Sequence, residues 1–188
     1  KEEDVIESID AETIYDVPNL MLKENLDIVV LKKLQLPQDK QPALKVWNEF
    51  LAKFKNPKHT VEIGLIGKYV ELKDAYKSIS EAFIHAGAQN EVQVNVNWIH
   101  SEDLTVKNVP NKLKKLNGIL VAPGFGERGI EGKIAAVKYA RENNIPFLGI
   151  CLGMQMAVIE FSRNVLGLKD ANSSEMEKKT ANPVIDLM

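Results

Sequence analysis

The sequence contains very little cysteine: Cys151 is the only one among 188 residues. One thiol cannot form a disulfide within the chain, so we expect a reducing, cytoplasmic setting. No apolar run approaches the roughly 20 residues that a membrane-spanning helix needs. The formal net charge of −2 gives no general attraction to nucleic acid or to an anionic membrane surface. We therefore expect neither a nucleic-acid partner nor a membrane partner.

Phosphate-binding and metal-binding patterns are also missing. The sequence has no G-x-x-x-x-G-K-[ST] pattern of a P-loop, and it offers no predicted metal site. Histidine is scarce, since only His59, His85 and His100 occur. The sequence opens at Lys1 without an initiator methionine and closes on an incipient strand at Met188. We therefore expect this chain to be a piece of a longer protein.

The first 59 residues have a helical and irregular pattern. The segment "PNLMLKENLDIVVLKKL" predicts a helix from about Pro18, and the proline-bounded "LPQDKQP" predicts a linker. In residues 43–54 the apolar side chains recur at helical spacing on one face, which must cover another apolar surface. The members of this face are Leu44, Trp47, Phe50, Leu51 and Phe54.

From Thr60 onward the pattern changes to alternating strands and helices. The predicted strands are 61–67, 92–99, 118–123 and 145–150, and the predicted helices are 74–87, 108–117, 131–143 and 152–166. Asp74 is the expected N-cap of the helix over 74–87. Such alternation predicts an α/β fold with a doubly wound, flavodoxin-like, mostly parallel sheet and helices on both faces, preceded by a helical linker region.

Cys151 occupies a chemically significant place in this predicted fold. It follows the strand over 145–150 at the carboxyl edge of the sheet, where open α/β sheets bind ligands. Gly149 and Gly153 flank it as glycines flank the serine of a nucleophile elbow. The N-terminus of the next helix favours a thiolate, and the backbone N–H of Leu152 can meet a developing oxyanion. The simpler alternative is a buried cysteine that acts as a small apolar side chain.

A glycine-rich loop precedes the helix over 131–143. Gly124, Gly126 and Gly129 spell G-x-G-x-x-G, the pattern of dinucleotide-binding turns. That pattern belongs to the first strand–helix turn of such folds, whereas this is the third, so we disfavour a dinucleotide site. The alternative is that the loop faces Cys151, and that the backbone N–H of Gly124 is a second oxyanion donor.

Several longer segments carry a family resemblance. They are "IGLIGKYVELKDAYKSI", "PGFGERGIEGKI", "IPFLGICLGMQMAVIEFSRNVLG" and "DANSSE". Together they resemble the CTP synthase family, and "GICLGMQ" resembles the nucleophile segment of class I glutamine amidotransferases. The resemblance covers essentially the whole chain. It implies the end of a synthase domain and an interdomain linker in 1–59, and an incomplete amidotransferase domain in 60–188.

The resemblance implies roles for residues around the sheet edge. Cys151 would attack the side-chain amide of L-glutamine and form a glutamyl thioester. Gly124 and Leu152 would hold the oxyanion through their backbone N–H groups. Gln155, Glu175 and the Gly124 loop would bind the substrate, with the Glu175 carboxylate facing the α-ammonium group of glutamine.

The same resemblance implies regulation close to the site. Phe125 and Arg128 correspond to positions that contact GTP, an allosteric activator of the family. The segment at Lys68 and Tyr69 resembles the mobile lid near the exit of ammonia. Pro123 departs from the glycine that many family members carry. Because proline has no N–H, the oxyanion hole here must rely on Gly124.

Taken individually, these side chains also have ordinary explanations. Arg128 could pair on the surface with Glu127 or Glu131, and Glu175 could be a solvated carboxylate. Gln155 could be a polar residue of a helix surface. The aromatic ring of Tyr69 could belong to the core.

The implied parent enzyme contains more than this chain. It converts UTP to CTP with ATP and magnesium in its synthase domain, and it assembles as a homotetramer largely through that domain. No cofactor is expected in the present chain, and a monomer is the expectation for it. The family's base is a histidine oriented by a glutamate far downstream of the nucleophile, and none of the three histidines matches that motif. Only His100 is predicted at the carboxyl edge, as a weak substitute.

Two other functions remain open from the sequence. A flavodoxin-like module could keep the cysteine elbow and yet serve as a non-catalytic regulatory or assembly surface, as the apolar face of the helix over 43–54 suggests. Another amidotransferase or thiol hydrolase could also use such an elbow. The protease-like hydrolases fit less well, because "DANSSE" and "GFGERGIEG" would have no role in them.

Overall fold

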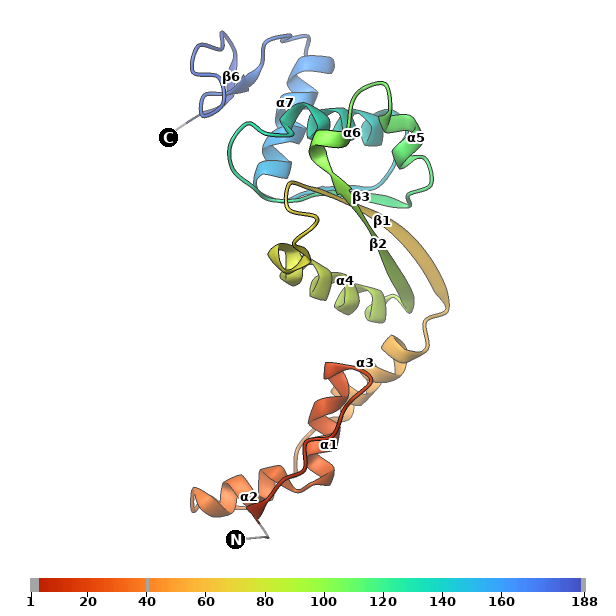
Figure 1. The fold of residues 1–188 in the computed structure, drawn as a ribbon, viewed down its shortest axis with the longest axis vertical. Helices are drawn as coiled ribbons and strands as arrows, with labels where there is room; N and C mark the ends of the chain where they lie inside the picture. Colours follow the sequence, from red (N-terminus) through yellow and green to blue (C-terminus); the bar gives the residue numbers. More distant parts are fainter. Residues whose placement is uncertain (1–3, 40, 187–188) are drawn as a thin grey trace.

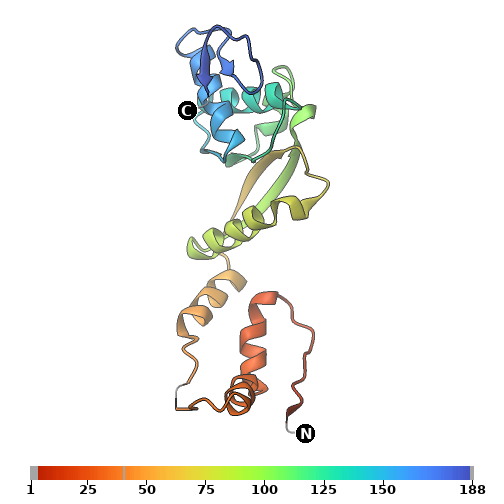
Figure 2. The same cartoon turned by 90° about the vertical axis from the view of Figure 1, so that its left-hand side faces the viewer.

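The structure is a computed structural model that describes residues 4–39 and 41–186. The predicted features at Lys1 and Met188 lie outside the described residues. The chain has a helical part at its N-terminal end and an α/β part at the opposite end of a long molecule (Figure 1). A view turned by 90° shows the same extended arrangement (Figure 2).

The helical part differs from the prediction in one respect. Its described elements are η2 (Ile14–Asp16), α1 (Val17–Lys23), α2 (Leu26–Lys33) and α3 (Lys45–Lys55). The single helix predicted from about Pro18 is therefore wrong, because it is divided into α1 and α2. Asn25 separates them with a φ of 56°, a left-handed conformation that asparagine adopts more readily than most residues.

The apolar face predicted for residues 43–54 lies on α3 and is used within the chain. It surrounds Tyr15, whose ring centroid lies 5.8 Å from Trp47, 5.2 Å from Phe50 and 5.5 Å from Phe54. The indole N–H of Trp47 donates to the Tyr15 carbonyl at 2.9 Å. His85 of α4 (Lys77–Gln89) stacks on Phe50 at 5.1 Å, so this aromatic cluster joins the helical part to the α/β part.

The α/β part is built on a parallel sheet. Its strands are β1 (His59–Gly67), β2 (Val92–His100), β3 (Gly118–Val121) and β4 (Phe147–Gly149). They lie in the order β2-β1-β3-β4, and each neighbouring pair is parallel. This is the start of a flavodoxin-like strand order, and it confirms the predicted fold class. All four carboxyl ends therefore meet at one edge of the sheet.

Helices cover both faces of the sheet, as predicted. α4 lies on one face, while α5 (Val109–Leu113), α6 (Ile130–Glu142) and α7 (Leu152–Asn164) lie on the other (Figure 1). The alternation of β3 explains the two cores, since successive side chains of a strand point to opposite faces. Ile119 and Val121 enter the core beneath α5, α6 and α7, and Leu120 enters the core beneath α4.

The start of α4 corrects a second prediction. A 3-10 turn, η3 (Lys73–Tyr76), precedes the helix, and Tyr76 rather than Asp74 takes the N-cap position without a side-chain cap. The Tyr76 hydroxyl instead accepts hydrogen bonds from the backbone N–H groups of Lys68 at 3.0 Å and Tyr69 at 3.3 Å. Tyr76 thereby holds the chain at the carboxyl end of β1.

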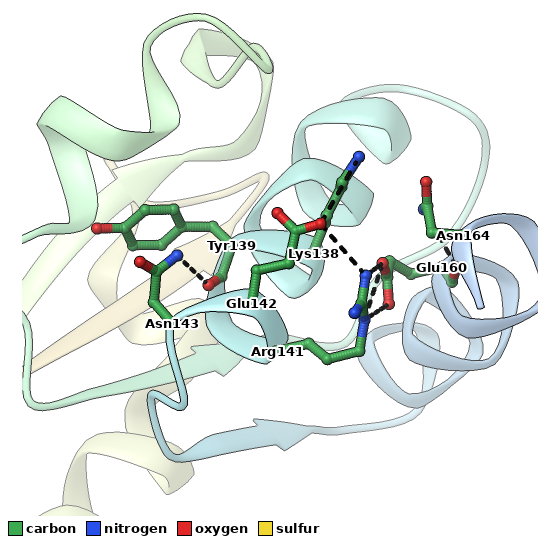
Figure 3. A network of polar contacts seen from close by, with 7 residues as sticks. All are labelled: Lys138, Tyr139, Arg141, Glu142, Asn143, Glu160 and Asn164. Atoms are coloured by element: carbon green, nitrogen blue, oxygen red, sulfur yellow. Dashed lines mark hydrogen bonds and ion pairs between the residues drawn. The ribbon is translucent and has the colours of Figure 1, made fainter.

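An ion pair braces the two helices beside the predicted nucleophile. Glu160 of α7 is only 1% exposed, and its carboxylate accepts hydrogen bonds from Arg141 of α6 at 2.8 to 3.2 Å. Figure 3 shows this contact together with the neighbouring Lys138–Glu142 pair on the surface of α6. The bidentate geometry fixes α7 relative to α6, and so fixes the helix that begins at the candidate site.

The last described residues form a small addition on α7. β5 (Asn172–Ser173) and β6 (Pro183–Ile185) pair in parallel, and Val184 and Ile185 pack against the core beneath α7. β6 is the short strand expected near the end of the sequence. Among the described residues no helix is both long and apolar enough to cross a membrane.

Candidate active site

Cys151 lies in a strained turn between β4 and α7. Its backbone has φ 52° and ψ −108°, a conformation that a residue with a side chain rarely adopts. A Cβ on Gly149 would lie 2.5 Å from the carbonyl carbon of Gly153, and a Cβ on Gly153 would collide with the Val121 carbonyl oxygen. The two glycines therefore allow the close packing that the turn needs, and the thiol side chain remains exposed, as expected for an elbow.

The glycine loop reaches the elbow across the sheet edge. A Cβ on Gly124 would lie 3.6 Å from Cδ2 of Leu152, so the two predicted oxyanion donors belong to neighbouring segments. Within residues 4–39 and 41–186, no acceptor is recorded for the backbone N–H of either residue. Leu152 is the first residue of α7, where backbone N–H groups have no partner within the helix. The glycine loop therefore lies against the first residue of α7, next to Cys151 in the chain.

Two buried lysines hold the glycine loop. The Lys68 ammonium, on a side chain that is 2% exposed, donates to the carbonyls of Phe125 and Gly126, each at 2.5 Å. Burial and the charge of Arg128 lower the pKa of Lys68, while Glu102 and Glu175 oppose that shift. Tyr69 next to it is 46% exposed, so its ring is not a core aromatic.

Lys133 is the second of these lysines, and reasoning from sequence missed it. It lies on α6 with a fully buried side chain, and its Nζ donates to the Ala122 carbonyl at 3.1 Å. The signal was present in "EGKIAAVKYA", because Lys133 falls on the same helical face as the apolar Ile130 and Val137. A charged residue on the apolar face of a helix indicates a special environment.

Gln155 and Glu175 line one pocket, beside α7 and the β5–β6 addition. The pocket has a volume of ≈ 540 Å³. Its lining residues are Gln155, Ser173, Ser174, Glu175, Lys178, Ile185 and Asp186. The side-chain oxygen of Gln155 is buried without a hydrogen-bond partner among the described residues, which suits a donor from a ligand. Gln155 lies one helical turn after Cys151, so the pocket adjoins the elbow along α7.

Phe125 and Arg128 of the glycine loop both have exposed side chains. The Phe125 side chain is 82% exposed. The Nε of Arg128 lies 2.8 Å from Glu102 Oε1. The alternative pairing of Arg128 with Glu127 or Glu131 is therefore wrong, and Glu131 instead pairs with Arg163 at 3.0 Å.

None of the three histidines has a recorded contact with the Cys151 thiol within the described residues. His59 begins β1, and His85 belongs to the aromatic cluster. His100 ends β2 at the carboxyl edge, as predicted, where its ring accepts from the Glu102 N–H at 3.3 Å and lies 3.9 Å from Glu71. No hydrogen bond or ion pair joins a histidine to Cys151 in the part of the chain that the structure describes.

These features define an α/β domain with an exposed cysteine in a strained strand–helix turn, and comparison with known proteins then gives the family. The family model for "Glutamine amidotransferase class-I" matches residues 71–186. Because that match covers more than half of the chain, the chain belongs to the class I glutamine amidotransferases. The fold and the elbow described above agree with this membership.

Individual relatives show which members of this family the chain resembles. The CTP synthase of Flavobacterium psychrophilum is 72% identical over 188 residues, covering 100% of this chain and 35% of the relative. That of Methanocaldococcus jannaschii is 57% identical over 192 residues, with 99% and 35% covered. The solved glutaminase domain of Trypanosoma brucei CTPS with bound acivicin is 42% identical, with a TM-score of 0.65 over 68% of this chain and 50% of that one. The expected resemblance to CTP synthase is confirmed, and the chain spans about a third of the length of these curated relatives.

Proposed function

We propose that this chain carries the glutamine-hydrolysing step of a CTP synthase. The observation that carries the proposal is the strained Cys151 turn facing the Gly124 loop, in a chain of the amidotransferase family. A strained, exposed nucleophile with free backbone donors nearby suits acyl transfer. A purely non-catalytic module would have no need of this arrangement.

The chemistry follows from the positions of these groups. The Cys151 thiolate attacks the amide carbon of glutamine, which forms a C–S bond and places negative charge on the amide oxygen. Gly124 and Leu152 donate their N–H groups to that oxyanion. Collapse of the intermediate breaks the C–N bond, releases ammonia once the nitrogen is protonated, and leaves a glutamyl thioester. Water then hydrolyses the thioester to glutamate. The base that moves these protons is not assigned to a described residue.

Gln155 and Glu175 fit the amino-acid end of the substrate. Both line the pocket beside α7, and Glu175 supplies a carboxylate for the α-ammonium group of glutamine. The unpartnered oxygen of Gln155 supports the same role, because a buried acceptor without a donor is costly in the free protein. We expect this pocket to decide selectivity for glutamine over simple amides.

In the whole protein, ammonia would be used to convert UTP to CTP with ATP and magnesium. We assign 1–59 to the end of the synthase domain and the linker, and 60–188 to the amidotransferase domain. Exposed Phe125 and Arg128 are the proposed GTP contacts, since an aromatic ring and a guanidinium suit a base and a phosphate. A homotetramer in the cytoplasm is the proposed setting of the whole protein, and the single cysteine suits a reducing compartment.

The test uses the full-length protein with Cys151→Ala and, as a matched control on α7, Phe161→Ala, whose side chain is 47% exposed. Glutamine-dependent ammonia release should fall by several powers of ten in Cys151→Ala, as when other covalent nucleophiles are removed. CTP formation from added ammonium chloride should persist in both variants. Glutamine hydrolysis by Cys151→Ala at the rate of Phe161→Ala would refute the proposal.

A further inference from the structure

The buried ammonium of Lys133 has unused hydrogen-bonding capacity beside the candidate site. A lysine ammonium carries three N–H donors. Lys133 Nζ donates one of them, to the Ala122 carbonyl, and no second acceptor is recorded in the described residues. Its side chain is fully buried. An ammonium that is removed from water and only partly hydrogen-bonded is costly, so a purely structural role explains its presence poorly.

The position of this ammonium relates it to the oxyanion hole. A Cβ built on Gly124 would lie 3.7 Å from Lys133 Nζ, so the ammonium lies directly against the glycine that carries a proposed donor. Lys68 lies against the same loop, with its Cδ 3.8 Å from that Cβ position. The loop over 122–126 is therefore held by two buried cations at three of its carbonyls.

The charges around Lys133 favour an anion in the site. The groups that interact with it electrostatically are Lys68, which opposes its charge, and Cys151, which favours it in the thiolate form. No carboxylate forms an ion pair with Lys133 in residues 4–39 and 41–186. Lys68 has the carboxylates of Glu102 and Glu175 near it, whereas the groups that act on Lys133 are Lys68 and Cys151, so the Lys133 cation is stabilised when negative charge develops between the loop and the elbow.

We propose that Lys133 is a positioning residue for the oxyanion hole: it fixes the loop through the Ala122 carbonyl and holds a positive charge behind Gly124. This inference rests on the proposed glutaminase function and adds a residue to that site. The charge acts when the thiolate attacks and the amide oxygen becomes negative, which is when a fixed cation lowers the barrier most.

The proposal has a signature in the pH dependence. Burial, together with the charge of Lys68, lowers the pKa of Lys133 to about 8. The cation is therefore present below that pH and is lost above it, so kcat for glutamine hydrolysis should decline above about pH 8. The thiolate fraction of a cysteine only increases over the same range. A decline in this direction therefore requires a group that loses a proton, as Lys133 does.

The experiment compares full-length wild type, Lys133→Met and Lys138→Met in glutamine hydrolysis across neutral and alkaline pH. Methionine has nearly the length of lysine without the charge, and Lys138 is a matched control at the surface of the same helix. We expect Lys133→Met to lower kcat by about ten- to a hundredfold with little change in KM, less than the ~10²–10³ for a direct donor. We also expect it to abolish the alkaline decline that wild type and Lys138→Met share.

Each contrary outcome is distinct. A Lys133→Met enzyme with the kcat and pH profile of Lys138→Met overturns the inference and leaves the glutaminase function intact. A wild type that hydrolyses no glutamine overturns the proposed function, and the inference falls with it. If circular dichroism shows that Lys133→Met is unfolded, the wild-type profile decides, because kcat that keeps rising above pH 8 contradicts a role for the Lys133 cation.

Discussion

Lys133 and Glu160 are both fully buried charged side chains, yet their surroundings differ. Glu160 receives the guanidinium of Arg141 in a bidentate pair, which compensates for the loss of water. The Lys133 ammonium donates to one neutral carbonyl, that of Ala122, and has the Lys68 cation nearby. The first arrangement is what a structural brace requires. The surroundings of Lys133, in contrast, lower the stability of the folded protein as long as the ammonium is charged.

That cost predicts a pH dependence of stability. The pKa of Lys133 is about 8 in the folded state against an ordinary 10.5. Between these values the unfolded chain keeps the proton and the folded chain has lost it, so the free energy of unfolding should rise with pH. The slope from this group is at most about 1.4 kcal/mol per pH unit. Urea unfolding of wild type and Lys133→Met at several pH values measures this slope as the pH dependence of the difference between their free energies of unfolding.

The variant provides the control, because all other titrating groups are common to both proteins. Below about pH 8 the difference in stability should be constant, with Lys133→Met the more stable, since methionine carries no buried charge. A difference that stays flat up to pH 10.5 would show that Lys133 is ordinary in its titration and reaches water.

At the residue scale, the sequence predicts Cys151 as the nucleophile, whereas reasoning from sequence missed Lys133. Cys151 could be found because its glycine neighbours and its place after a strand are local features. Lys133 could be suspected from its apolar face, but its partners lie on a loop whose path depends on the whole sheet edge. The pairing of Arg128 with Glu102 was missed for the same reason, because the two residues come from different strand–helix units.

At the scale of elements, the β4–α7 turn depends on contacts between backbones. Adding a methyl group at Gly153 would force it into the Val121 carbonyl of β3, and backbone atoms cannot move aside as a flexible side chain can. We expect Gly153→Ala to destabilise the protein by roughly 3 kcal/mol, at the upper end of overpacking effects. It should also slow modification of Cys151, because the turn must shift. Urea unfolding and alkylation with iodoacetamide measure the two effects.

Gly167→Ala is the matched control. Gly167 has φ +77°, and nothing lies within 4 Å of its Cβ position, so alanine there meets backbone strain without a collision. The expected cost is about 1 kcal/mol, with no change in alkylation of Cys151. Equal effects of the two substitutions would show that strain, and not the close approach of Gly153 to β3, determines the cost.

The order of the elements could be predicted almost completely, and their ends less well. Apolar strands alternating with amphipathic helices determine the parallel sheet and its two covered faces. The break at Asn25 is a single left-handed residue within an otherwise helical pattern, and the 3-10 turn before α4 ends at Tyr76, whose hydroxyl is bonded to the Lys68 backbone. Asp74 is a good cap residue by composition, yet Tyr76 takes that position because its hydroxyl is held by the backbone at Lys68.

At the scale of the whole molecule, the aromatic cluster determines how the two parts are joined. Tyr15 is 6% exposed among the rings of α3, and its hydroxyl contacts both Glu81 and His85 of α4. Burial and the neighbouring Glu81 carboxylate raise the pKa of Tyr15 to about 12. The phenol therefore stays protonated as a donor throughout the physiological range. The helical part is thus attached to α4, on the sheet face opposite α7, so the elbow is left free.

The last prediction concerns the 188-residue chain by itself. We expect it to fold around the sheet and to react at Cys151 faster with a glutamine-derived chloroketone than with iodoacetamide, because the elbow, the glycine loop and the pocket at Gln155 are all present. We expect no appreciable glutamine turnover, since no histidine contacts Cys151 in the described residues and loss of such a base costs several powers of ten. Ammonia release from glutamine measures turnover, with Cys151→Ala as background. Turnover near the full-length rate, abolished by Cys151→Ala, would contradict this and make His100→Gln the next variant to measure.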